Sequence, residues 1–130
     1  MPFMDHSQEF LKLVDEAKAE TRDVSVADTL ERKKNGATLI DVREDNEFAA
    51  GHAAGAEHVG RGIIERDIRS KHPDKDEELI LYCGGGFRSA LSAVNLQKMG
   101  YTNVWSMAGG WSAWKAADAP VEVGVLIGVH

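Results

Sequence analysis

Short apolar segments alternate with helical segments along the whole chain, and this alternation constrains the fold more than any other feature of the sequence. Strands are expected at residues 24–26, 38–42, 56–59, 79–82 and 103–105, and helices at 7–20, 27–34, 44–50, 61–70, 88–99 and 111–117. Such a pattern predicts an α/β fold, with a central, mainly parallel five-stranded sheet, helices on both faces and right-handed crossovers. A functional crevice is then expected beyond the carboxyl ends of the strands, where Asp41 and Cys83 fall.

Composition narrows the classes of function. The chain has 130 residues, of which 43% are hydrophobic, so one domain with a true core is expected. A formal net charge of -6 argues against general nucleic-acid binding. Neither a leader at residues 1–6 nor an apolar run of membrane length is visible, and the single cysteine forms no internal disulfide. A soluble cytoplasmic protein is the expectation, with no membrane partner.

The single cysteine stands in an unusual context. Cys83 ends an apolar strand and is followed by Gly84, Gly85 and Gly86, then Phe87 and Arg88 at the start of a helix. Consecutive glycines cost backbone entropy, and their use is left-handed or close-approach geometry. A strand, a glycine loop and a helix start can aim several backbone N–H groups at one centre, which favours a thiolate or an anion held there. We therefore expect a reactive cysteine nucleophile rather than a buried structural one.

Several ordered motifs around this loop resemble those of a known family. They are Leu39-Ile40-Asp41-Val42-Arg43-Glu44 with Glu47-Phe48, then Gly51-His52-Ala53-Ala54-Gly55-Ala56, then Cys83-Gly84-Gly85-Gly86-Phe87-Arg88-Ser89-Ala90, then residues 96–104, and finally Ala108-Gly109-Gly110-Trp111. Over about residues 22–120 the chain resembles a single-domain rhodanese, a sulfurtransferase of the rhodanese-like superfamily. We expect an N-terminal helix extension at 1–21, a rhodanese-like domain at 22–120 and a C-terminal tail at 121–130.

The resemblance implies a thiosulfate sulfurtransferase, a transferase of sulfur-containing groups. Cys83 would accept a sulfur atom from thiosulfate or a similar donor and pass it from a persulfide to cyanide or a thiol, with thioredoxin or a sulfur-relay protein as candidate protein partners. The backbone from Gly84 to Arg88 would cradle the outer sulfur. The chemistry needs no cofactor, because sulfur is both nucleophile and carrier.

Two other functions remain open. One is a persulfide carrier or binding module for a protein partner. The other is a Cys-dependent phosphatase of similar fold, but such phosphatases have seven residues from cysteine to arginine. This chain has six from Cys83 to Arg88, which favours sulfur over the wider phosphate.

The remaining site residues are assigned supporting or substrate-binding roles. Asp41 and Arg43 are expected to form an ion-pair network under the loop, with direct substrate contact as the alternative, and Ser89 is expected to start the following helix. Arg88 either fixes the loop through carboxylates or carbonyls, or binds the substrate anion. Arg61 either holds an anionic donor or starts a helix in solvent.

The histidines and the two ends of the chain complete the expectations. Glu47 and His52 are expected to cap or tie the neighbouring turn, and no histidine spacing predicts a metal site. The helix at 7–20 would cover the sheet or form a dimer contact. The tail at 121–129 would add an edge strand or pack on a partner.

Overall fold

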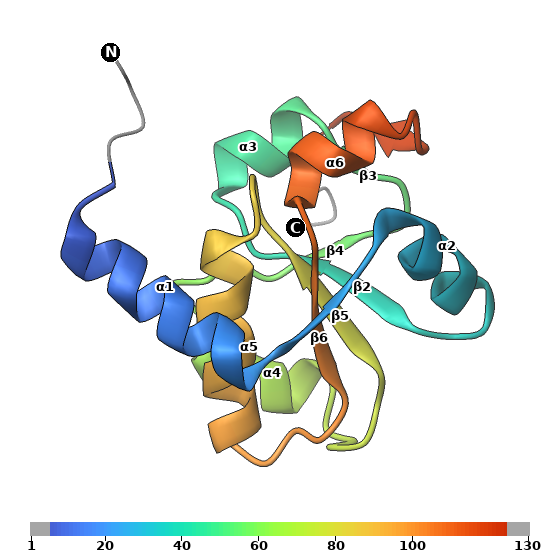
Figure 1. The fold of residues 1–130 in the computed structure, drawn as a ribbon. Coiled ribbons are helices and arrows are strands. Elements are labelled where there is room, and N and C mark those ends of the chain that lie inside the picture. Colours follow the sequence, from blue (N-terminus) through green and yellow to red (C-terminus); the bar gives the residue numbers. More distant parts are fainter. Residues whose placement is uncertain (1–5, 125–130) are drawn as a thin grey trace.

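A computed structural model describes residues 6–124, which form an α/β fold (Figure 1). The helices are α1 (Gln8–Glu20), α2 (Val26–Lys34), α3 (Asp45–Ala50), α4 (Ile64–Lys71), α5 (Phe87–Lys98) and α6 (Gly110–Ala116). The strands are β1 (Arg22–Val24), β2 (Thr38–Asp41), β3 (His52–Ala53), β4 (Glu57–His58), β5 (Leu79–Tyr82), β6 (Val104–Met107) and β7 (Val121–Glu122).

The central sheet has five parallel strands in the order β1-β6-β5-β2-β4, and this confirms the predicted fold class. Strand β5 lies at its centre and is buried on both faces, which matches its uninterrupted apolar sequence. Cys83 follows β5 directly, so the middle of the sheet sets the position of the cysteine loop.

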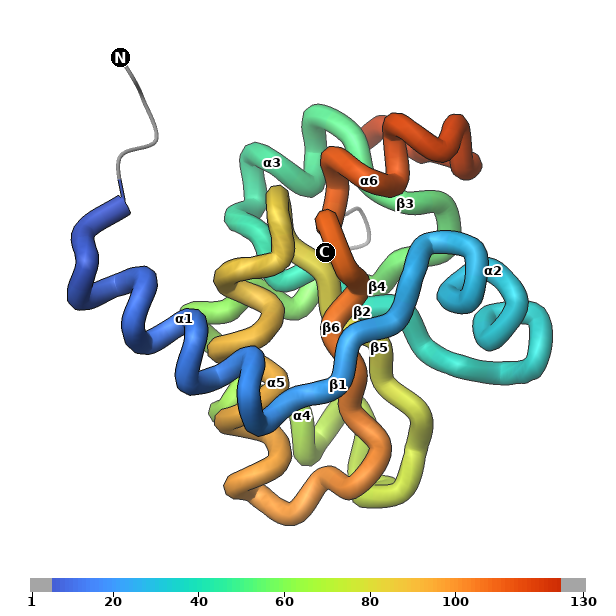
Figure 2. Tube along the Cα trace, viewed as in Figure 1, coloured from blue at the N-terminus to red at the C-terminus, as the bar shows by residue number. Residues whose placement is uncertain are grey.

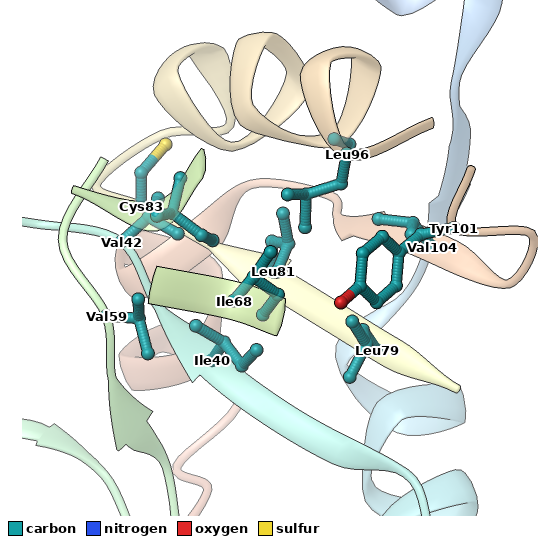
Figure 3. Packing of buried hydrophobic residues seen from close by; sticks show 12 residues of the cluster. Ile40, Val42, Val59, Ile68, Leu79, Leu81, Cys83, Leu96, Tyr101 and Val104 are labelled. Atoms are coloured by element: carbon teal, nitrogen blue, oxygen red, sulfur yellow. The ribbon is translucent and has the colours of Figure 1, made fainter. Parts of the chain in front are cut away.

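Side chains of successive strand residues point to opposite faces and build two separate cores. On one face, Ile40, Leu79 and Leu81 pack with α4 and α5, and Cys83 belongs to the same cluster (Figure 3). On the other face, Leu39, Ile80 and Tyr82 pack with residues of α2 and α6. In Figure 3 the Cys83 sulfur points away from the sheet toward the helix that covers it.

Helix α1 lies outside the layered core, along α5 (Figures 1 and 2). Its start is capped by Ser7, whose hydroxyl accepts the Phe10 N–H at 3.1 Å. Val14 and Ala17 are buried, whereas Leu13 is 56% exposed. The helix packs on α5 rather than on the sheet, so the expectation that it covers the sheet was wrong, and a dimer contact stays a prediction.

Several predicted strand and helix boundaries were wrong, and one short strand was not predicted. The first strand was expected at residues 24–26, but it is β1 (Arg22–Val24), because Ser25 caps α2 by accepting the Asp28 N–H at 3.0 Å. Gly51 ends α3, and His52 Nδ1 lies 2.8 Å from the Phe48 carbonyl oxygen, so His52 ties this turn as expected. His52 also begins β3, a strand that was not predicted, which pairs antiparallel with β7.

Part of the expected C-terminal tail lies in a second sheet, which has the two strands β3 and β7. Val121 and Glu122 form β7 as its second strand, residues 123 and 124 are in no strand, and residues 125–129 lie outside the described range. Between residues 6 and 124 no helix is both long and apolar enough to cross a bilayer. The division into extension, domain and tail stays a prediction.

Candidate active site

The Cys83 sulfur lies at the N-terminus of α5. Sγ accepts the backbone N–H of Gly86 at 3.1 Å and that of Ser89 at 3.4 Å, and the Ser89 hydroxyl lies 3.5 Å away. Gly86 is the N-cap of α5 and has φ +104°, a conformation that favours glycine. The first N–H groups of a helix have no partner within it and carry partial positive charge, so this geometry stabilises a thiolate or another anion.

The other side of the loop is held by α6. The N–H groups of Trp111 and Ser112 donate to the carbonyl oxygens of Cys83 at 2.7 Å and Gly84 at 3.1 Å. This approach requires a glycine at 110, because a Cβ there would overlap the Cys83 carbonyl oxygen. Two helix N-termini therefore hold one loop, α5 through the sulfur and α6 through the carbonyl oxygens.

Arg88 is held by Glu47 from α3. Its Nη1 and Nη2 donate to the two Glu47 carboxylate oxygens at 3.0 and 3.3 Å. Hydrogen bonding within this pair lowers the pKa of Glu47 and raises the pKa of Arg88. Glu47 also accepts the Glu44 N–H at 2.9 Å as part of a capping box. One carboxylate thus ties the start of α3 to the cysteine loop.

Asp41 and Arg43 form a buried network beside this assembly. Arg43 donates to both Asp41 carboxylate oxygens and, at 2.7 Å, to the Gly51 carbonyl that closes α3. The Tyr82 hydroxyl donates to Asp41 at 2.6 Å and accepts the Ala53 N–H at 3.0 Å. Burial opposes the Arg43 charge, but Asp41 outweighs it and raises the pKa of Arg43. The same carboxylate adds to the effect of burial in raising the pKa of Tyr82.

A hollow of about 490 Å³ opens over the loop. Its walls come from four parts of the chain: His6, Phe10, Glu47, Cys83, Gly84, Gly85, Phe87, Arg88 and Ser112. Of the ten residues predicted for the site, five line this hollow: Cys83, Gly84, Gly85, Phe87 and Arg88. Asp41 and Arg43 do not line this hollow, which fits their expected supporting role.

Arg61 is exposed and lies elsewhere. It lines a different hollow, between α1 and α5, with residues such as Glu16 and Lys98. The sequence placed it near Cys83 because it follows β4 at the carboxyl edge of the sheet. The chain turns away there, after the Arg61 N–H donates to the Val42 carbonyl at 3.0 Å.

Three contributors were missed or only half seen from the sequence. Glu47 was expected to cap a turn, but its ion pair with Arg88 was not predicted. Ser106 of β6 hydrogen-bonds the Ser89 hydroxyl at 2.8 Å and so supports the loop from beneath. Gly110 was expected only as part of the Ala108-Gly109-Gly110-Trp111 motif, without a role at the cysteine loop. The Gly109-Gly110 pair at the end of a strand was the available signal, since paired glycines at that point indicate close backbone approach.

Comparison with known proteins agrees with this geometry. Residues 25–117 match the family described as Rhodanese-like domain. The chain belongs to this family. The expected family is thereby confirmed, and with it the expected enzyme class, a rhodanese-type sulfurtransferase.

Individual relatives share the fold over most of the chain. The chain is 33% identical over 98 residues to the thiosulfate sulfurtransferase GlpE of Ectopseudomonas mendocina, covering 75% of this chain and 88% of the relative. A Rhodopseudomonas palustris protein of unknown function, described as a possible tyrosine phosphatase, superposes with a TM-score of 0.76 at 29% identity, covering 94% and 99% of the two chains. The thiosulfate sulfurtransferase of Pseudomonas aeruginosa superposes with a TM-score of 0.74 at 25% identity, covering 80% of this chain and 20% of that one.

Proposed function

We propose that this protein moves the sulfane sulfur of thiosulfate, or of a similar donor, to cyanide or a thiol through a persulfide on Cys83. The observation that carries the proposal is the position of Sγ, which accepts the N–H groups of Gly86 and Ser89 at the start of α5. The relatives named thiosulfate sulfurtransferase support the choice of donor.

The first half-reaction loads the enzyme. The Cys83 thiolate attacks the outer sulfur of thiosulfate, a new S–S bond forms, and the old S–S bond breaks with its electron pair leaving on sulfite. The negative charge then lies on the outer sulfur of the persulfide. Backbone N–H groups that surround it stabilise that charge, and the loss of one such donor from an anion site costs about 3 kcal/mol.

Peptide geometry supplies further donors. The C=O and N–H of a trans peptide point in opposite directions. The carbonyl oxygens of Cys83 and Gly84 point toward the α6 N-terminus. The N–H groups of the same two peptides, on Gly84 and Gly85, then point away from α6, and we assign them, with those of the α5 start, to the outer sulfur.

The second half-reaction unloads the enzyme. Cyanide or a thiolate attacks the outer sulfur, the persulfide bond breaks, and its electron pair returns to Cys83 Sγ. Thiocyanate or a new persulfide leaves. In this scheme Arg88 uses the N–H donors that Glu47 does not occupy to bind the anionic end of the donor, while Asp41, Arg43 and Ser89 hold the loop. A role for Arg61 in donor binding has no support from its position.

Intact-mass spectrometry tests this scheme directly. Wild-type protein treated with thiosulfate and desalted should gain one sulfur atom, and cyanide should remove it with release of thiocyanate. Cys83→Ser should show neither change, and because the chain has one cysteine the result is unambiguous. A wild-type protein that stays unmodified would refute the proposal.

Two further assays on the same proteins distinguish sulfur transfer from the carrier and phosphatase functions. Slow loading by thiosulfate with fast loading from a protein persulfide would indicate a sulfur carrier for a protein partner. Turnover of an aryl phosphate that disappears in Cys83→Ser would indicate a phosphatase. Thioredoxin or a relay protein as acceptor, and a cytoplasmic location, stay predictions.

A further inference from the structure

Part of the wall of the hollow is aromatic and is formed by His6, which precedes α1, Phe10 of α1 and Phe87 of α5. The His6 ring lies 5.0 Å from the Phe87 ring and 5.2 Å from the Phe10 ring, and the Phe10 and Phe87 centroids are 6.2 Å apart. These three side chains, the aromatic rim, line the same hollow as Cys83. His6 and Phe10 precede residues 25–117, which match the rhodanese-like family, so this part of the site is an addition to the family's domain.

The rim is a fixed part of the fold. Helix α1 buries Val14 and Ala17 against α5 and ends where the Gln97 side chain donates to the Glu20 carbonyl at 2.9 Å. Lys18 lies over the Phe87 ring, with Nζ 5.0 Å from its centroid. Phe87 thus contacts His6 and Phe10 and has Lys18 over its ring, so the rim is held by packing between residues 6–18 and the start of α5.

Lys18 lies over the Phe87 ring but does not line the hollow, and within the hollow Phe10 and Phe87 provide surface for apolar contact. The nearby guanidinium of Arg88 is paired with the Glu47 carboxylate at 3.0 Å. Cyanide has two atoms and cannot fill a space of about 490 Å³ or contact its rim while it attacks the sulfur. A molecule that reaches the sulfur and also covers the rim needs an apolar body attached to its nucleophile.

We infer that the preferred sulfur acceptor is a small thiol with an apolar aryl or alkyl body, which packs on Phe10 and Phe87 while its sulfur attacks. This inference rests on the proposed sulfur transfer. The thiol loses its proton to solvent, its thiolate attacks the outer sulfur, and the persulfide bond breaks with its electron pair returning to Cys83. The product is the aryl or alkyl persulfide of the acceptor.

The expected preference follows from surface burial. Covering roughly 80 Å² of apolar surface at about 25 cal/mol per Å² corresponds to a preference of about thirtyfold over a thiol without the apolar body. Phe10 forms about half of that contact surface, so its truncation should reduce the preference about fivefold.

The test uses full-length protein loaded with sulfur and checked by mass. Second-order rate constants for unloading are measured with cyanide, 2-mercaptoethanol and benzyl mercaptan, the last two being primary thiols of similar acidity. The variants are Phe10→Ala, Phe10→Leu, which keeps apolar bulk, and Leu11→Ala. Leu11 is on the same helix, is 37% exposed and does not line the hollow, so it is the matched control.

We expect wild-type protein to react faster with benzyl mercaptan than with 2-mercaptoethanol. Phe10→Ala should lower the ratio of the benzyl mercaptan rate constant to the cyanide rate constant about fivefold. Phe10→Leu should lower this ratio less, and Leu11→Ala should leave it unchanged. Equal rate constants for the two thiols in wild-type protein, or a ratio unaffected by Phe10→Ala, would overturn the inference. Either result could occur with normal loading and normal cyanide reaction, whereas a failure of wild-type protein to load would refute the proposed function instead.

Discussion

The contact between Gly110 and the cysteine loop offers the sharpest test of how the site is held. A Cβ at position 110 would overlap the Cys83 carbonyl oxygen and lie 3.0 Å from the carbonyl carbons of Cys83 and Gly84. These are backbone atoms of the loop, so no flexible side chain can move to relieve the overlap. In Gly110→Ala either the loop or the start of α6 must shift.

Two effects of this substitution can be separated. Gly110 has φ +53°, and placing alanine in that region costs roughly 1–2 kcal/mol by itself. Displacement of the loop adds a catalytic effect, because an error of about 1 Å in the position of reacting groups can lower a rate by ~100-fold. We therefore expect a modest loss of stability and a loss of persulfide formation of about two orders of magnitude.

Gly36→Ala is the matched control. Gly36 has φ +105° and no atom within 4 Å of an added Cβ, so it carries the backbone penalty without the overlap. The assays are thermal unfolding and the rate of sulfur loading from thiosulfate followed by intact mass. If Gly110→Ala loads sulfur within about threefold of the Gly36→Ala rate, loop placement by α6 does not control the chemistry.

Two further predictions concern ion pairs. Glu47→Gln should lower kcat/KM for thiosulfate about tenfold with little change in unfolding temperature. The reason is that Arg88 loses a charge-assisted hydrogen bond that orients its guanidinium. Unchanged kinetics would mean that Arg88 needs no such support. His72 contacts Glu57 at 2.8 Å and Glu77 at 3.0 Å, and although burial opposes its charge, these carboxylates raise its pKa. Its contribution is fully present below the unfolded-state pKa of about 6.5 and is lost as pH rises through the raised folded-state value. His72→Gln should therefore lower the unfolding temperature near pH 6 by more than near pH 9, and a difference independent of pH would contradict this.

The sequence was sufficient for those features that depend on local pattern. The strand at 79–82 was predicted with its observed bounds, since four apolar residues between a charged turn and a glycine loop leave little choice. The parallel sheet followed from alternation alone. The position of Cys83 at a helix start also followed, because the glycines and the helical run are adjacent to it in the chain.

Features that depend on contacts between distant segments could not be read in the same way. The Arg88–Glu47 pair joins residues 41 apart, and a carboxylate in the first turn of a helix already has a sufficient local role as a cap. Strand β3 has two residues and exists only because β7 pairs with it. Arg61 follows a strand that ends at the right edge of the sheet, but the direction of the next turn decides where its side chain lies.

A chain with a net charge of -6 needs a local source of positive potential if it handles anionic sulfur, and the backbone supplies most of it here. Among residues 6–124, Arg88 is the only lysine or arginine that lines the hollow over Cys83, and Glu47 compensates its charge. The α5 N-terminus and the peptides oriented by α6 are not compensated in this way. In the proposed scheme the negative charge moves only between the Cys83 sulfur and the outer sulfur of the persulfide, which lie close together. Fixed backbone dipoles can therefore stabilise the charge at either sulfur, and during the transfer, without rearrangement. We therefore expect the side chains around the hollow to vary with the acceptor. The starts of α5 and α6 and the glycines of the cysteine loop should not vary, because they position the backbone N–H groups.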